Sequence, residues 1–323
     1  MEIRGLIPAT VTPFNTDGSV DYKCLSAHVA RVGSATGLYG VCVNGHAGEV
    51  LTLTSDERKN IVAAARKVLP RQLKVIAGIA SHSLADLVQQ GLNAKEAGAD
   101  MLLVFPLFDV RPYRHLARNP DAVFSVFQRL DREVNLPMSV FQYPETAGAV
   151  YSLEALMRIA ELPNVIAMKA ATGSPTKYAE LHDALHDRIS VLAACDAPSL
   201  LGMLLHDAPG ALVGISVVGT QQWSDLVREA TSGSAQKAKS IHNSFAVPLM
   251  RAIYEYQLHR TPTSTPAANK EALVQLGELS SSWVRSPAIN VDDAKREEIR
   301  FALSKVGLKV SKAAAGLFVS AIR

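Results

Sequence analysis

Eight short apolar runs recur along the chain, and none shows the strict polar alternation of a strand with one wet face. They cover residues 6–13, 38–45, 74–80, 100–106, 137–144, 165–170, 190–196 and 211–218. Continuous apolar runs of this length are typical of strands buried on both faces, as in parallel sheets. The pattern therefore predicts a parallel sheet of eight strands.

Amphipathic segments separate these runs. In residues 53–69 acidic side chains follow Ser55, which we expect to cap a helix, and basic side chains gather toward the end. In residues 81–100 apolar side chains recur at helical spacing until a break at Gly98. The alternation of strand and helix predicts a (β/α)8 barrel, an α/β fold. The rival is an open doubly wound sheet, but residues 10–19 lack its glycine-rich GxGxxG loop.

The C-terminal part of the chain has a different character. After Val218 we find no convincing strand, and the pattern indicates helices interrupted by a linker at residues 259–269. We therefore predict two parts, a catalytic barrel over residues 1–220 and a helical C-terminal extension over residues 221–323.

Composition narrows the class of protein. Of the 323 residues, 48% are hydrophobic and 20% are charged, as in ordinary globular chains with a large core. The formal net charge is +3 with scattered Lys and Arg, so we expect neither nucleic acid nor membrane as a partner. The apolar runs fall short of the roughly 18 residues that cross a bilayer, and we expect no secretory signal. Because Cys24, Cys42 and Cys195 lack paired spacing, we expect the protein to work in a reducing cytoplasm. With nucleic acid and membrane excluded, we expect its partner to be a small molecule.

Lys169 is unusual because it follows four apolar residues within the run 165–170. Burying an unpaired ammonium is costly, so such a lysine shifts its pKa or finds a partner. Barrel active sites lie at the C-terminal ends of the strands, where a partly neutral amine attacks a carbonyl to form a Schiff base. The alternative is a structural lysine whose charged head reaches the barrel rim.

Gly45 and Gly48 bracket two residues at the end of the second run. Small residues let backbone N–H groups converge on an anion, and the carboxylate of a 2-oxo acid would suit such a site. A plain tight turn is the alternative. The rule for strand ends also selects Asp196, which either orients its neighbours in the site or caps the next helix together with Ser199.

Taken in order, these segments resemble the dihydrodipicolinate synthase / N-acetylneuraminate lyase superfamily of class I aldolases. The resemblance covers nearly the whole chain and rests on GLIPATVTPFNTDGSVD (5–21), GHAGEVLTLTSDER (45–58), KEAGADMLLVFP (95–106), FQYPETAG (141–148), MKAATG (168–173) and GALVGISVV (210–218). It implies a (β/α)8 barrel with C-terminal helices, often assembled as a tetramer of tight dimers. It also implies that Lys169 forms an imine with pyruvate or another 2-oxo acid, without a metal or organic cofactor.

The resemblance also assigns the substrate-binding residues. In the turn it implies that the backbone of Ala47, with Gly45 and Gly48, binds the carboxylate. The other expected pocket residues are Thr12, Phe141, Gly214 and Ile215.

Two departures from the family pattern concern proton transfer. The tyrosine of the family motif Y-N-x-P is here Phe141, which has no hydroxyl. Tyr143 lies two residues on, on the same strand face but roughly 6–7 Å away, so it either supplies the missing hydroxyl or forms an aromatic wall. The first hydroxyl residue of the family motif G-T-T-G-E is here His46, an alternative acid or base whose other role is to hydrogen-bond the turn.

His182 and His186 have the i, i+4 spacing of paired metal ligands on a helix. Their helix belongs to the outer ring of the predicted barrel, away from the catalytic face. We therefore expect a solvated surface pair and no metal site.

The leading functional hypothesis is a Schiff-base-forming lyase, aldolase or dehydratase acting on pyruvate or another 2-oxo acid. The alternative is a non-catalytic or degraded relative that binds a 2-oxo acid or sugar acid, and the missing tyrosine at Phe141 favours it. A true 4-hydroxy-tetrahydrodipicolinate synthase is disfavoured, because the arginine that holds its aldehyde substrate is replaced by Thr146. We expect a homo-oligomer, either a dimer or a tetramer.

Overall fold

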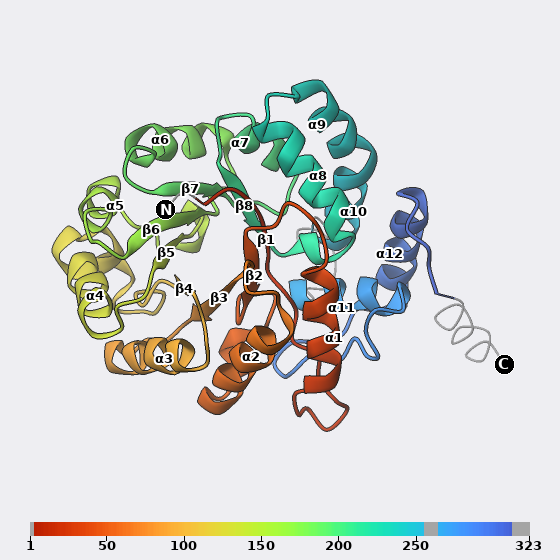
Figure 1. Cartoon of the computed structure of the whole chain (residues 1–323), viewed down its shortest axis with the longest axis horizontal. Helices are drawn as coiled ribbons and strands as arrows, with labels where there is room; N and C mark the ends of the chain where they lie inside the picture. Colours follow the sequence, from red (N-terminus) through yellow and green to blue (C-terminus); the bar gives the residue numbers. More distant parts are fainter. Residues whose placement is uncertain (1–2, 255–263, 312–323) are drawn as a thin grey trace.

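Eight parallel strands form the centre of the molecule, shown as a computed structural model in Figure 1. The structure describes residues 3–254 and 264–311. The strands are β1 (Gly5–Pro8), β2 (Gly40–Val43), β3 (Lys74–Ile79), β4 (Met101–Val104), β5 (Met138–Gln142), β6 (Val165–Ala170), β7 (Ser190–Ala193) and β8 (Gly210–Val213). Sequence neighbours pair in parallel from β2 to β8, β1 pairs with β8, and parallel bridges at Leu6–Leu38 and Ala9–Cys42 join β1 to the β2 side. The predicted (β/α)8 barrel is therefore confirmed.

Each predicted run overlaps its strand, although β1 and β8 begin one residue before their runs, and several runs extend beyond the strand end. The run 6–13 outlasts β1, and the run 211–218 outlasts β8 and continues into a short helical turn, Ile215–Val217. Residues past the strand ends are buried in loops, where the apolar pattern persists without ladder hydrogen bonds. Apolar runs thus located the strands better than they located the strand ends.

Helices surround the strands in the ring that Figure 1 shows. They are α1 (Tyr22–Val32), α2 (Ser55–Val68), α3 (Leu84–Glu96), α4 (Pro120–Glu133), α5 (Leu153–Ile159), α6 (Pro175–Leu185), α7 (Leu200–Leu204) and α8 (Thr220–Thr231). The predicted cap of α2 is wrong by one residue. Thr54 caps the helix in a reciprocal pair with Glu57, and Ser55 is the first helical residue. The predicted break at Gly98 has its reason in a φ of +96°, two residues after α3 ends.

Four further helices lie to one side of the barrel in Figure 1. They are α9 (Ala235–Ile241), α10 (Val247–Ile253), α11 (Thr265–Gln275) and α12 (Asp293–Lys305). The predicted linker 259–269 lies partly outside the described residues, and α11 begins within it. Because α8 packs against β1 and β8, we count it with the barrel, while the proposed division at residue 220 remains a prediction. Within the described residues no helix combines the length and hydropathy that a membrane crossing requires.

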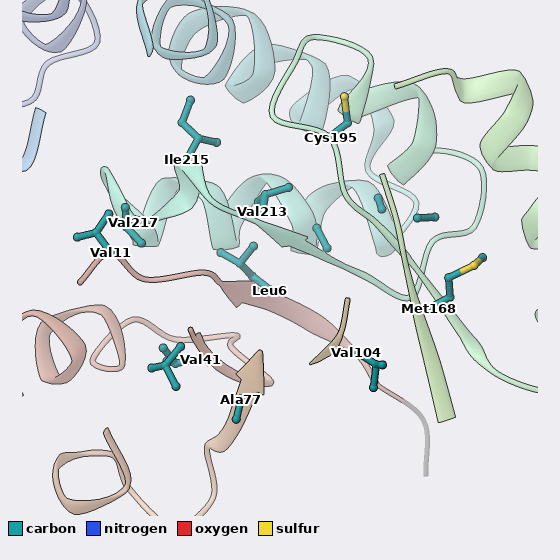
Figure 2. Close-up of a cluster of buried hydrophobic side chains, with 14 of the residues drawn as sticks. Leu6, Val11, Val41, Ala77, Val104, Met168, Cys195, Val213, Ile215 and Val217 are labelled. Carbon is teal, nitrogen blue, oxygen red and sulfur yellow. The ribbon is translucent and has the colours of Figure 1, made fainter. Parts of the chain in front are cut away.

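Two apolar clusters flank the strands. The inner cluster fills the barrel and includes Ile7 and Ala167, whereas the outer cluster lies between strands and helices and includes Leu6 and Met168. Figure 2 shows members of the outer cluster. Side chains alternate between the two faces of a strand, so Lys169, the residue after Met168, belongs with Ala167 on the inner face. The barrel thus places this lysine at the C-terminal end of its interior.

Candidate active site

Lys169 projects from β6 beside β5, where Phe141 is its register partner. Its Nζ lies 3.9 Å from the centroid of the Phe141 ring, a cation–π contact. Among the described residues, Nζ makes no hydrogen bond or salt bridge. The side chain is half-buried and borders a cavity of about 590 Å³ at the C-terminal ends of the strands.

The charge state of Lys169 depends on two opposing effects. Desolvation lowers the pKa of its ammonium, and the nearby carboxylate of Asp196 opposes that shift. Asp196 is directed elsewhere, because its Oδ1 accepts a hydrogen bond of 2.9 Å from the backbone N–H of Ile215. Burial raises the pKa of the Asp196 carboxyl. The arrangement favours an accessible fraction of neutral amine.

His46 and Tyr143 meet across the cavity. The Tyr143 hydroxyl and His46 Nε2 are 2.9 Å apart, although 97 positions separate the residues in sequence. The sequence left these residues as alternatives, and the structure joins them in one hydrogen-bonded pair. Phe105 and Phe141 pack against the imidazole with ring centroids at 4.7 and 5.3 Å.

Both members of this pair are neutral near pH 7. Burial raises the pKa of the Tyr143 hydroxyl. Desolvation by the surrounding protein atoms lowers the pKa of His46, even though the residue keeps exposed surface. The positive charge of Lys169 is the second cause of this lowering. A neutral imidazole has one protonated and one bare nitrogen, so a His–Tyr pair can pass a proton in either direction.

The turn after β2 has the geometry of an anion site. Asn44 and Glu49 hold left-handed φ values of 55° and 56° at its two ends. Among the described residues, the backbone N–H groups of His46 and Ala47 have no hydrogen-bond acceptor, and both residues line the cavity. Two adjacent free amides at a cavity wall suit a carboxylate.

Three other predicted substrate-binding residues lie in or against the turn after β2 and not at the cavity surface. Thr12 is buried and donates its hydroxyl to the Gly48 carbonyl at 2.8 Å, so it braces the turn. Gly45 and Gly48 are buried within the turn rather than at the cavity surface, and a Cβ at Gly48 would lie 3.2 Å from backbone atoms.

The β8 end differs from expectation at two points. Gly214 lines the cavity, but Ile215 is fully buried and its N–H is bound to Asp196. The expected capping by Asp196 and Ser199 is wrong. In the part of the chain that the structure describes, no side chain caps α7. Asp196 instead accepts from Ile215 in the loop after β8, and Ser199 Oγ lies 3.1 Å from Cys195 Sγ.

The C-terminal extension contributes residues that sequence reasoning missed. Tyr254 and Thr265 line the cavity, and Asn269 donates to the Tyr254 hydroxyl at 2.9 Å. A Cβ at Gly214 would lie 2.7 Å from that hydroxyl, which explains the glycine there. No local pattern marks Tyr254, because it reaches the site only through packing of the extension on the barrel.

A buried ion pair anchors the turn from outside the cavity. Lys270 of α11 is fully buried and donates to Glu49 Oε1 at 2.5 Å and to the Trp283 carbonyl at 2.8 Å. The Arg285 backbone N–H donates to Glu49 Oε2 at 3.1 Å. The sequence motif contained Glu49, but its partners lie more than 200 positions away, at separations of 221 and 236.

His182 and His186 lie outside this site, as predicted. The expectation that both are solvated is wrong for His182, which is 7% exposed. Its ring stacks on that of His186, with centroids 5.0 Å apart.

Comparison with known proteins places these features in a family context. Residues 2–306 match the Dihydrodipicolinate synthetase family. The chain is 31% identical to the 4-hydroxy-tetrahydrodipicolinate synthase of Hyphomonas neptunium, with 94% of this chain and 99% of the relative covered. Its identity to the enzyme of that name from Phenylobacterium zucineum is 30%, with 94% and 98% covered. The crystal structure of the chloride-inhibited dihydrodipicolinate synthase from Acinetobacter baumannii, complexed with pyruvate, matches with a TM-score of 0.83 and 25% identity over 95% of this chain and 100% of that one.

Proposed function

The chain belongs to the dihydrodipicolinate synthetase family, and on that premise we propose that it forms a Schiff base between Lys169 and pyruvate or another 2-oxo acid. Membership makes it an enzyme of the class I aldolase type, a lyase. The observation that carries the finer proposal is the amine of Lys169, which borders the cavity. No carboxylate of the described residues is bonded to it, and desolvation lowers its pKa. A neutral amine in that setting is a nucleophile toward a ketone.

The turn after β2 supplies the anion site for the substrate. With its carboxylate on the backbone N–H groups of His46 and Ala47, a 2-oxo acid lies in the cavity that Lys169 borders. Lys169 Nζ adds to the ketone carbon, the carbonyl oxygen takes up a proton, and loss of water then leaves the protonated imine. The negative charge of Asp196 lies near enough to act on this positive charge and stabilises it.

The pair of His46 and Tyr143 moves the protons of these steps. It protonates the departing hydroxyl as water leaves, and it returns a proton to the carbon next to the imine after carbon–carbon bond cleavage. In the reverse direction the pair removes that proton and forms the enamine, which attacks an aldehyde. Loss of a hydroxyl from the neighbouring carbon would give the dehydratase variant of the same chemistry.

Phe141 favours a second candidate, a relative that binds a 2-oxo acid or sugar acid without turnover. Its ring covers Lys169 Nζ at 3.9 Å and offers no hydroxyl at the position that the family motif gives to tyrosine. A true 4-hydroxy-tetrahydrodipicolinate synthase has less support. Thr146 replaces the expected arginine, is exposed, and does not line the cavity.

Trapping the imine tests the proposal. The protein is incubated with pyruvate and borohydride, and the reduced adduct is located by peptide mass spectrometry. We expect the adduct on Lys169 and its loss in Lys169→Arg, which keeps the positive charge but not the nucleophile. Failure to trap it on Lys169 would contradict the proposal.

Turnover separates the remaining hypotheses. The same protein is assayed with a panel of aldehydes plus pyruvate and with 2-oxo-3-deoxy acids. Adduct with turnover supports the lyase, and adduct without turnover supports the degraded enzyme. Binding without an adduct supports the non-catalytic relative. Assembly as a dimer or tetramer and a cytoplasmic location complete the proposal, and sedimentation velocity measures the assembly.

A further inference from the structure

A cluster of two imidazoles and one carboxylate lies at the end of the barrel opposite the candidate active site. His182 and Asp183 come from the second half of α6, and His206 follows α7. Their side chains border a cavity of about 530 Å³ together with Ser190 and Pro209, at the N-terminal ends of β7 and β8. One ligand atom from each of the three residues lies within 4.8 Å of the others.

The hydrogen bonding of His182 determines which of its nitrogens faces the cluster. Nε2 lies 3.2 Å from the Asp207 carbonyl, which only accepts, so Nε2 carries the proton. In the neutral imidazole, Nδ1 therefore holds the lone pair. It is buried and has no hydrogen-bond partner among the described residues, and the residue is 7% exposed.

A buried, unpartnered acceptor is unfavourable unless something binds it. The arrangement matches that of metal-binding histidines, which donate their second ring N–H to a carbonyl or carboxylate and so fix the orientation of the ligating nitrogen. For His182 the carbonyl of Asp207 has this supporting role.

The separations suit a small divalent ion. Ligands at about 2.1 Å around a tetrahedral centre lie roughly 3.4 Å apart. Asp183 Oδ1 is 3.6 Å from His182 Nδ1. It also accepts a hydrogen bond of 3.1 Å from His206 Nε2, and an ion bound there would take the place of that proton. The ligand atoms of the two imidazoles lie within 4.8 Å of one another. The His206 side chain is 41% exposed and is able to move to adjust this distance.

We propose that His182 Nδ1, the Asp183 carboxylate and His206 Nε2 bind a divalent first-row transition ion, with zinc as the best match. Two imidazoles and one carboxylate form a known zinc ligand set, while Mg²⁺ and Ca²⁺ prefer oxygen ligands. The adjoining cavity admits water as the fourth ligand. The ion links α6 to the loop before β8 and so stabilises the barrel end remote from the candidate active site.

Metal titration of the tag-free protein tests this site. The protein is first treated with EDTA and dialysed, and Zn²⁺ binding is then measured by isothermal titration calorimetry. Co²⁺ absorption reports the coordination geometry. We expect one ion per chain and a rise in Tm with Zn²⁺, because a ligand that binds the folded state stabilises it.

Two neighbouring histidines supply the matched variants. His206→Ala removes a proposed ligand from an exposed position, and Asp183→Asn weakens another. We expect each to reduce Zn²⁺ affinity by at least about 10-fold, since loss of even an outer partner of a ligand has that effect. His186→Ala removes the ring that stacks on His182 without removing a proposed ligand, and it should bind Zn²⁺ as the parent does.

The metal-free Tm of each variant shows whether its fold is intact. Absence of one-to-one binding, or an equal loss of affinity in His206→Ala and His186→Ala, overturns the proposal. The borohydride adduct on Lys169 should form equally well in EDTA, so the two proposals can fail independently.

Discussion

Lys169 on β6 and Lys270 on α11 are two lysines whose ammonium groups have different bonding partners. Burial lowers the pKa of both ammonium groups, and that of Lys270 falls to about 8. Lys270 Nζ is bonded to the carboxylate of Glu49 at 2.5 Å and lies 4.2 Å from the centroid of the Phe14 ring. Lys169 has an aromatic ring at a similar distance, 3.9 Å, but no bonded carboxylate among the described residues.

The difference shows what separates a structural lysine from a nucleophilic one. The carboxylate near Lys169 belongs to Asp196, and the backbone N–H of Ile215 holds it. The carboxylate of Glu49, in contrast, stays bonded to its lysine. It accepts from Lys270 and also from the Arg285 backbone N–H. An ammonium that is bonded to a carboxylate joins two parts of the chain. An ammonium whose neighbouring carboxylate is bonded elsewhere can lose its proton and react.

Breaking the Lys270 pair should have the largest effect on stability. Lys270→Met leaves the carboxylate of Glu49 buried without its partner, which costs about 3–5 kcal/mol in unfolding free energy. Urea unfolding measures the loss. Lys59→Met is the matched control, since the salt bridge of Lys59 with Glu96 is exposed and contributes about 1 kcal/mol or less.

A second substitution distinguishes the lost pair from lost packing. Glu49→Gln, added to Lys270→Met, removes the stranded charge and should recover part of the stability. If Lys270→Met were no more harmful than Lys59→Met, the buried pair would have no anchoring role.

The comparison of the two lysines also shows what sequence reasoning can reach. Lys169 was recognisable because a charged residue interrupts a buried strand, a pattern contained in a few consecutive positions. The role of Lys270 was not recognisable, because it depends on a contact with Glu49 over 221 positions. The fold was predictable for the same reason as Lys169, since the alternation of strand and helix is local.

Errors at the site arose where a side chain has two possible partners. Asp196 looked like a helix cap because Ser199 follows it closely, but the carboxylate reaches the loop after β8 instead. His46 and Tyr143 were separate candidates until tertiary packing brought their polar atoms to 2.9 Å. Local chemistry named these residues, and only the three-dimensional arrangement selected their partners.

Removing the proton-transfer pair should slow every step in which the pair moves a proton, including loss of water from the adduct, while Lys169 stays able to form the imine slowly. His46→Ala should reduce turnover by about 100-fold or more, because general acid–base catalysis contributes about that factor. Tyr143→Phe removes only the hydroxyl and keeps the aromatic contact with Phe141, so it is the conservative partner variant. We expect a comparable loss from it and little additional loss in the double variant, because the residues act as one unit.

The measurement is kcat together with the yield of trapped adduct. The final adduct yield after long incubation should stay near that of the parent, while kcat and the rate of adduct formation fall. Turnover near the parent rate in His46→Ala would remove the imidazole from the mechanism.

The smallest expected effect concerns the charge of Asp196, which opposes the lowering of the Lys169 pKa by desolvation. Only the neutral amine attacks, so the rate of imine trapping should rise with pH. The rate should level off below pH 10.5, the ordinary lysine pKa, because desolvation lowers the pKa of Lys169. The negative charge of Asp196 raises that pKa, and Asp196→Asn removes the charge while keeping an oxygen for the Ile215 N–H. The rising limb of the profile should therefore move toward lower pH. A shift toward higher pH, or none, would mean that the Asp196 carboxylate does not act on the lysine, and the contrast with the Glu49–Lys270 pair would then rest on desolvation alone.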